Sequence, residues 1–133
     1  MIRLAALFIL TGPAVVAWVW SAAAVAVPEA EMVTVRLSNF AFTPNLLHLR
    51  SGVPVRLRMV NDSGGSHSVS APALFLLASA FPDGAPPAGG KVELGPGQTQ
   101  DLLLVPHAVG TYKLECTHFL HGLFGMTGSI VVE

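Results

Sequence analysis

The chain has 133 residues, a formal net charge of −1 and one cysteine, and 52% of its residues are hydrophobic. This length suits a single domain that buries its own core. The near-neutral charge, without a basic patch, excludes an electrostatic interface for nucleic acid, and a lone cysteine excludes a disulfide within the chain.

Residues 1–26 have the composition of a secretory signal peptide. Arg3 precedes a long apolar stretch, and the segment ends in Ala24-Val25-Ala26, which matches an A-x-A cleavage site. We therefore predict a signal peptide over residues 1–26 and a folded domain over residues 27–133. The alternative is an uncleaved membrane anchor, because the apolar run approaches the length that crosses a bilayer. In either case we expect the folded part to be periplasmic or otherwise exported.

From Glu31 onward the sequence is organised in short, strand-like segments. Residues 33–38 and 53–60 alternate apolar with polar side chains, which is the period of a half-buried strand. Further candidate strands are residues 47–50, 91–94, 100–105, 110–116 and 129–133, separated by turn signals rich in Gly and Pro. Met32 and Met59 are expected to pack in the core. Six or seven such strands predict an all-β fold, a β-sandwich.

One segment interrupts the strand pattern. Residues 71–81 contain Leu and Phe without alternation, and Ser70 and Pro72 suit the cap and first turn of a helix. We predict a short helical insert that covers the core; a docking or membrane-facing surface is the alternative. Residues 82–90 are rich in Pro and Gly and predict a loop with no element of its own.

The lone cysteine lies in a chemically distinctive run near the C-terminus. Cys116 is followed after five residues by His121 and after ten by Met126, and His67 stands in a Gly-Gly-Ser-His segment after the third predicted strand. A thiolate, two imidazoles and a thioether are the ligand set of a mononuclear copper electron-transfer site. An unpaired thiol in an exported protein is open to oxidation, so metal binding also accounts for its presence.

His118, two residues after Cys116, is a competing imidazole. We prefer His121, because two residues leave too little loop for both side chains to reach one metal in the usual geometry. His118 then binds extra copper, lies on the face where electrons enter, or is a solvated loop residue. His48 and His107 have no partner motif and are expected at the surface.

Residues 37–45, 60–68, 110–116 and 125–133 resemble the cupredoxins, the small blue-copper proteins that include plastocyanin, pseudoazurin and azurin. The resemblance covers nearly all of residues 31–133. It implies a Greek-key β-sandwich that holds one copper ion, cycling between Cu(I) and Cu(II), at one end. The implied copper ligands are His67, Cys116, His121 and Met126.

The loop after Cys116 departs from plastocyanin-like loops, which place the histidine three residues after the cysteine. The spacing here is similar to the type 1 site of multicopper oxidases, but the chain lacks their paired His-x-His segments and most of their length. A binuclear copper site of the oxidase-subunit type would need a second cysteine. No Ser, His and acid constellation suggests a hydrolase. We therefore do not expect an enzyme.

The predicted function is that of an exported type 1 copper protein which transfers single electrons between redox partners. Such partners dock transiently, and Leu120, Leu123 and Phe124 are candidates for an apolar docking patch. We expect a monomer, with membrane contact only if residues 1–26 stay attached. Copper binding for tolerance or delivery is the alternative function, and a structural sandwich with an incidental cysteine is a further possibility.

Three polar residues near the predicted ligands are candidates for hydrogen bonds that tune the site. Ser68 and Thr117 are each adjacent to a predicted ligand, and Asn61 precedes the segment that carries His67. Hydrogen bonds around a metal site orient its ligands and adjust its redox potential.

Overall fold

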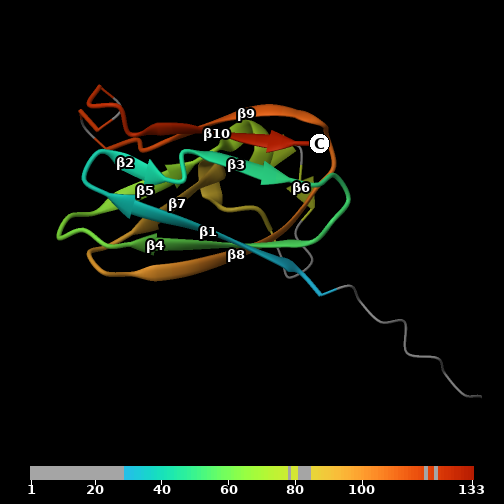
Figure 1. Cartoon of the computed structure of the whole chain (residues 1–133), viewed down its shortest axis with the longest axis horizontal. Helices are drawn as coiled ribbons and strands as arrows, with labels where there is room; N and C mark the ends of the chain where they lie inside the picture. Colours follow the sequence, from blue (N-terminus) through green and yellow to red (C-terminus); the bar gives the residue numbers. More distant parts are fainter. Residues whose placement is uncertain (1–28, 78, 81–84, 119, 122) are drawn as a thin grey trace, which may run out of the picture.

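The computed structural model describes residues 29–77, 79–80, 85–118, 120–121 and 123–133. Within these residues, ten strands form two five-stranded sheets that pack face to face (Figure 1). The strand orders are β2-β1-β4-β8-β6 and β3-β10-β9-β5-β7. The predicted all-β sandwich is confirmed. The predicted signal peptide lies outside the described residues.

Both sheets are mixed, because β1 runs parallel to β4 and β3 runs parallel to β10, whereas the other pairs are antiparallel. Consecutive strands such as β2 and β3, or β4 and β5, lie in different sheets, as in a Greek-key sandwich. The strands of the first sheet are β1 (Glu31–Ser38), β2 (Ala41–Thr43), β4 (Val55–Asn61), β6 (Ser79–Ala80) and β8 (Thr99–Pro106). Those of the second are β3 (Leu46–Leu49), β5 (His67–Ser70), β7 (Lys91–Leu94), β9 (Gly110–Glu115) and β10 (Thr127–Val132).

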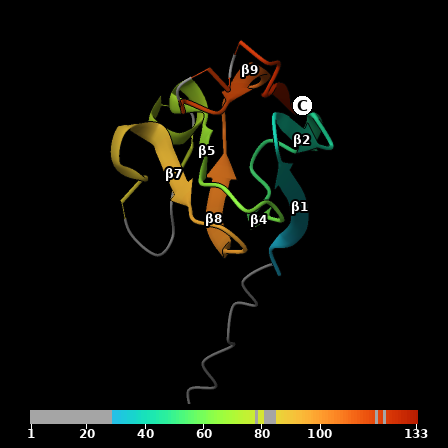
Figure 2. The same ribbon diagram turned by 90° about the vertical axis from the view of Figure 1, so that its left-hand side faces the viewer.

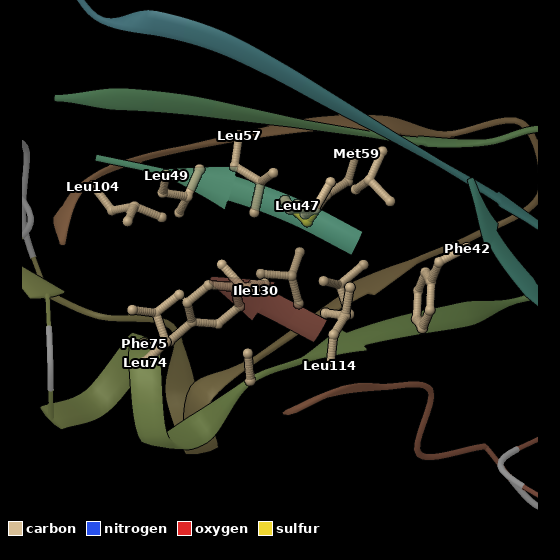
Figure 3. Close-up of a cluster of buried hydrophobic side chains, with 14 of the residues drawn as sticks. Phe42, Leu47, Leu49, Leu57, Met59, Leu74, Phe75, Leu104, Leu114 and Ile130 are labelled. Atoms are coloured by element: carbon tan, nitrogen blue, oxygen red, sulfur yellow. The ribbon is translucent and has the colours of Figure 1, made fainter. Parts of the chain in front are cut away.

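The core lies between the sheets and follows the alternation of the strands. In β4 every second residue is buried, and the arginines between them face outward. Figure 3 shows Leu57 and Met59 from the first sheet above Leu114 and Ile130 from the second. The prediction for Met59 is confirmed. The prediction for Met32 is wrong: it is 49% exposed, because it shares the outward-facing side of β1 with the exposed Thr34.

The predicted helix over residues 71–81 is reduced to one short helical turn, η1 (Ala73–Leu77), followed by strand β6. Leu74 and Phe75 are fully buried, so this turn covers the core as expected. Ser70 does not cap a helix, because it pairs within the second sheet with Lys91 and Glu115. Sheet pairing therefore overrides the local helix signal on both sides of the turn.

The Pro- and Gly-rich segment after β6 also differs from expectation. The prediction that residues 82–90 have no element is wrong at their end, where Ala88–Gly90 form a short 3-10 turn, η2, immediately before β7. No helix in the described part of the chain is long and apolar enough to cross a membrane.

Candidate metal centre

The predicted ligands come from two loops at one end of the sandwich. His67 is the first residue of β5, at the end of the loop that follows β4. Cys116 follows the last residue of β9, and the chain then forms the loop that leads to β10. These two loops lie at the end of the molecule opposite the C-terminus (Figure 1), and Figure 2 looks onto that end. Sheet pairing thus brings distant parts of the chain together at one rim.

Three donor atoms converge at this rim. The Nδ1 atoms of His67 and His121 are 3.1 Å apart, and Sγ of Cys116 lies 3.9 Å from the first and 3.5 Å from the second. Metal–nitrogen and metal–sulfur bonds of about 2.0–2.3 Å allow one ion to reach donors at these separations. One thiolate and two imidazoles are also the equatorial donors of a type 1 copper site. The donor set and its spacing therefore fit a copper ion.

Burial makes two of these donors well suited to bind a metal. His67 is 1% exposed and Cys116 is 3% exposed. Burial lowers the pKa of His67, and the rings of His121 and His118 lower it further, so the imidazole is neutral at pH 7. A neutral imidazole is the form that binds a metal, so protons compete weakly for this position.

The buried ring of His67 has little else to bond to. Its Nδ1 atom approaches only the other two donors, His121 and Cys116, among the polar contacts of the described residues. Its Nε2 atom is buried and has no hydrogen-bond partner within the same residues. A buried polar ring is normally satisfied by hydrogen bonds, so its orientation toward the donor cluster is a further sign of a metal-binding role.

The loop between Cys116 and Met126 is closed by its own backbone. The N–H of Cys116 donates to the carbonyl of Met126 at 3.1 Å, and the N–H of Met126 donates to the carbonyl of His121 at 3.0 Å. Gly125 has a φ of +88°, a conformation that favours glycine. Gly128 is required for a different reason, because a Cβ there would collide with the backbone oxygen of Asn45. A larger residue at either position would therefore strain or block the local backbone.

Met126 is fully buried next to this backbone closure. It is the residue before β10, so its main chain is held both by the hydrogen bonds of the loop and by the start of the strand. Its assignment as the fourth, axial ligand stays a prediction.

Ser68 links the two loops through hydrogen bonds around the sulfur. Its N–H donates to Sγ of Cys116 at 3.4 Å, and its hydroxyl lies 3.8 Å from the same sulfur. That hydroxyl accepts a hydrogen bond from the N–H of Thr117 at 2.8 Å and lies 3.0 Å from the Thr117 hydroxyl. Ser68 is fully buried, so these contacts are shielded from water. Ser68 and Thr117, two of the predicted hydrogen-bonding neighbours of the ligands, thus form hydrogen bonds beside the site.

Asn61 secures the loop that leads to His67. Its Nδ2 donates to the carbonyls of Gly65, Leu94 and Gly95 at 2.8, 3.2 and 2.9 Å. Its Oδ1 accepts from the N–H and hydroxyl of Ser63 at 3.0 and 2.8 Å. The amide is 1% exposed, so this network ties the loop after β4 to the turn after β7. Asn61 thus acts on the position of His67 rather than on the donors directly.

His118 contributes no atom to the donor cluster, although its ring stacks on that of His121. Its Nε2 lies 2.8 Å from a carboxylate oxygen of Glu93 on β7, and its side chain is 32% exposed. His48 and His107 are exposed, as expected. Two neighbours of the site were missed from the sequence: Glu93, and Phe40, whose ring lies 5.2 Å from that of His121. No local motif marks them, because each meets the loop only through the fold.

Comparison with known proteins identifies the family of this chain. A family model, the cupredoxin-like domain, matches residues 12–132. The chain belongs to the cupredoxin-like family. A search of curated proteins finds no match.

Solved structures support the fold of this cupredoxin. Reduced auracyanin from the photosynthetic bacterium Roseiflexus castenholzii superposes with a TM-score of 0.61 at 19% identity, covering 78% of this chain and 98% of auracyanin. Auracyanin B gives a TM-score of 0.60 at 24% identity, covering 78% and 89%. A multicopper oxidase from Campylobacter jejuni gives 0.59 at 15% identity, covering 78% of this chain but 30% of the oxidase. The family binds one copper ion, and the donors gathered here fit that cofactor.

Proposed function

We propose that this protein is an exported type 1 copper protein that carries single electrons between redox partners, with His67, Cys116, His121 and Met126 as its ligands. The observation that carries the proposal is the convergence of one thiol and two imidazole nitrogens, 3.1 to 3.9 Å apart, at the rim of a cupredoxin sandwich. Bound copper would supply the one-electron chemistry by alternating between Cu(II) and Cu(I).

The protein's own residues hold the donors in place in both oxidation states. Cys116 would hold copper as the thiolate, and the N–H of Ser68, 3.4 Å from the sulfur, would stabilise its negative charge. His67 is fixed by its strand and by burial. Rigid donors would limit the rearrangement that accompanies the gain or loss of an electron, which favours rapid transfer.

Electrons would enter and leave through the exposed side of the site. His121 is the one ligand that is not fully buried, and Leu120, Leu123 and Phe124 beside it are 40%, 83% and 61% exposed. Apolar side chains around a partly exposed ligand suit a small, transient encounter with a redox protein. A reduced partner would donate one electron here, and an oxidised partner would later accept it.

The decisive experiment is to add one equivalent of Cu(II) to the purified metal-free protein and record its visible absorption and electron paramagnetic resonance spectra. An intense thiolate-to-copper band, absent in Cys116→Ser, is expected. Reversible bleaching by a one-electron reductant would then support electron transfer. Copper binding without this band, or release of the copper on reduction, would instead indicate a role in copper tolerance or delivery.

A further inference from the structure

The imidazole of His121 is contacted by two aromatic rings that are not part of the donor set. Phe40 meets it edge to face, with ring centroids 5.2 Å apart and planes at 90°. His118 stacks on it, with centroids 5.5 Å apart and planes at 24°. Both arrangements are favourable for aromatic pairs. Two rings from different parts of the chain therefore contact His121.

His118 is itself fixed to the sheet. Its Nε2 lies 2.8 Å from Glu93, and the other carboxylate oxygen of Glu93 lies 2.9 Å from Nζ of Lys91. Glu93 is on β7, opposite Ser68 of β5 in the strand register. The stacked ring is thus anchored to a strand rather than only to the loop that carries it.

Phe40 adopts a conformation that needs an explanation. It lies between β1 and β2 with a φ of +64°, in the left-handed region that bulky side chains rarely occupy. The two-residue turn that pairs Ser38 with Ala41 accounts for this backbone conformation, but such a position favours glycine, and a phenylalanine that is 42% exposed is not placed there by core packing. The ring instead contacts His121 and, with centroids 5.0 Å apart, Phe124. Strained backbone of this kind is concentrated at functional sites.

The two histidine ligands differ in how they are supported. His67 begins a strand and is buried, whereas His121 lies on a loop and is partly exposed. A ligand on a loop needs support from neighbouring side chains to keep its orientation. Phe40 and His118 are the neighbours in position to provide it.

We propose that Phe40 and His118 form a ring clamp, a pair of positioning residues that hold the His121 imidazole in its ligating orientation before metal binds and in both oxidation states. The inference rests on the proposed function in taking His121 as a ligand. The clamp predicts that loss of either ring loosens His121 even in the metal-free protein.

The first test uses metal-free protein with 13C-labelled histidine. Nuclear magnetic resonance relaxation of the His121 ring is compared among wild type, Phe40→Leu and His118→Ala. Phe40→Tyr, which keeps the ring, is the rescue variant. Leu46→Ala is the matched control, because Leu46 is 46% exposed and lies on β3. We expect greater ring motion in the first two variants, and wild-type behaviour in the rescue and control variants.

The second test measures Cu(II) affinity by competition. Loss of one aromatic pair is expected to weaken binding about three- to ten-fold in Phe40→Leu and in His118→Ala, with broadened paramagnetic resonance lines. Phe40→Gly separates this effect from stability, because it removes the ring while relieving the positive φ. Its affinity should fall although its unfolding midpoint is little changed.

The clamp is refuted if Phe40→Leu and His118→Ala match Leu46→Ala in both ring motion and copper affinity. It is also refuted if Phe40→Tyr behaves like Phe40→Leu, because the ring would then be irrelevant. Failure of the proposed function is a separate result: wild type would lack the copper–thiolate band, while ring motion in the metal-free protein would still decide the clamp.

Discussion

Replacing Asn61 by alanine tests how much of the site's geometry is built into the protein before metal binds. The side chain makes five hydrogen bonds, three from Nδ2 to carbonyls and two to Oδ1 from Ser63, and is 1% exposed. The two Nδ2 hydrogens are shared among three acceptors, so about four bonds are lost, each with a net value of about 1 kcal/mol. Because water can reach the exposed side of the loop, we expect a loss of about 2–4 kcal/mol.

This loss is large for a domain whose total stability is about 5–15 kcal/mol. At about 4–8 °C per kcal/mol, the unfolding midpoint of the metal-free protein should fall by roughly 10–30 °C. Chemical denaturation followed by circular dichroism gives the free energy directly. Copper affinity should fall as well, because the loop before His67 loses its attachment to the turn after β7.

Two variants complete the design. Asp62→Asn, at the adjacent position, removes an exposed ion pair with Arg36 and should cost less than about 1 kcal/mol. Asn61→Asp keeps the acceptor for Ser63 but places a carboxylate against three carbonyl oxygens, so it should be at least as destabilising as alanine. If Asn61→Ala unfolds within about 0.5 kcal/mol of Asp62→Asn, the reasoning from hydrogen bonds is refuted.

Three further predictions concern the sulfur ligands and a surface pair. Ser68→Ala removes the hydroxyl that lies 3.8 Å from the Cys116 sulfur and 2.8 Å from the Thr117 amide. It should lower the free energy of unfolding by about 1 kcal/mol and the reduction potential by about 20 mV. An unchanged potential in voltammetry would show that the Ser68 hydroxyl does not act on the sulfur. Met126→Leu should keep the thiolate band but raise the potential by about 50 mV, if the thioether favours Cu(II) by about 1 kcal/mol. An identical potential would show that Met126 is only a core residue. Hydrogen bonds from Arg58 lower the pKa of Asp101 in the folded protein. The ionised Asp101 side chain therefore adds stability above about pH 4, and this contribution is lost as pH falls through the lowered pKa. Urea unfolding from pH 6 to 2 should show a shallower decline for Asp101→Asn, and parallel curves would contradict this.

Much of the architecture was predictable because strand formation follows a local period. Alternation in residues 53–60 marks β4, whose inward side chains include Leu57 and Met59. Met32 shows the limit of this reasoning, because an apolar residue next to a core position lies on the outward side of the strand. The helix predicted over residues 71–81 failed similarly, because Ser79 pairs with Pro106 of β8, a partner that no local pattern reveals.

The donor types available for chemistry can be read from the residues alone. The single thiol of Cys116 is followed by His121 and Met126 at spacings of five and ten residues, and His67 stands apart from them. These donor types predict a copper ligand set, because few other sites need them. The sequence also predicted that Ser68 and Asn61 lie near the site, because Ser68 is adjacent to a predicted ligand and Asn61 precedes the segment that carries His67.

The orientation of those atoms, in contrast, depends on the folded chain. It directs Nδ1 of His121 to within 3.5 Å of the Cys116 sulfur while His118 turns to Glu93, and it places Phe40 against the His121 ring. The contacts of His118 with Glu93 and of Phe40 with His121 join residues far apart in the chain, so they depend on how the strands and loops pack and not on the preferences of any short segment.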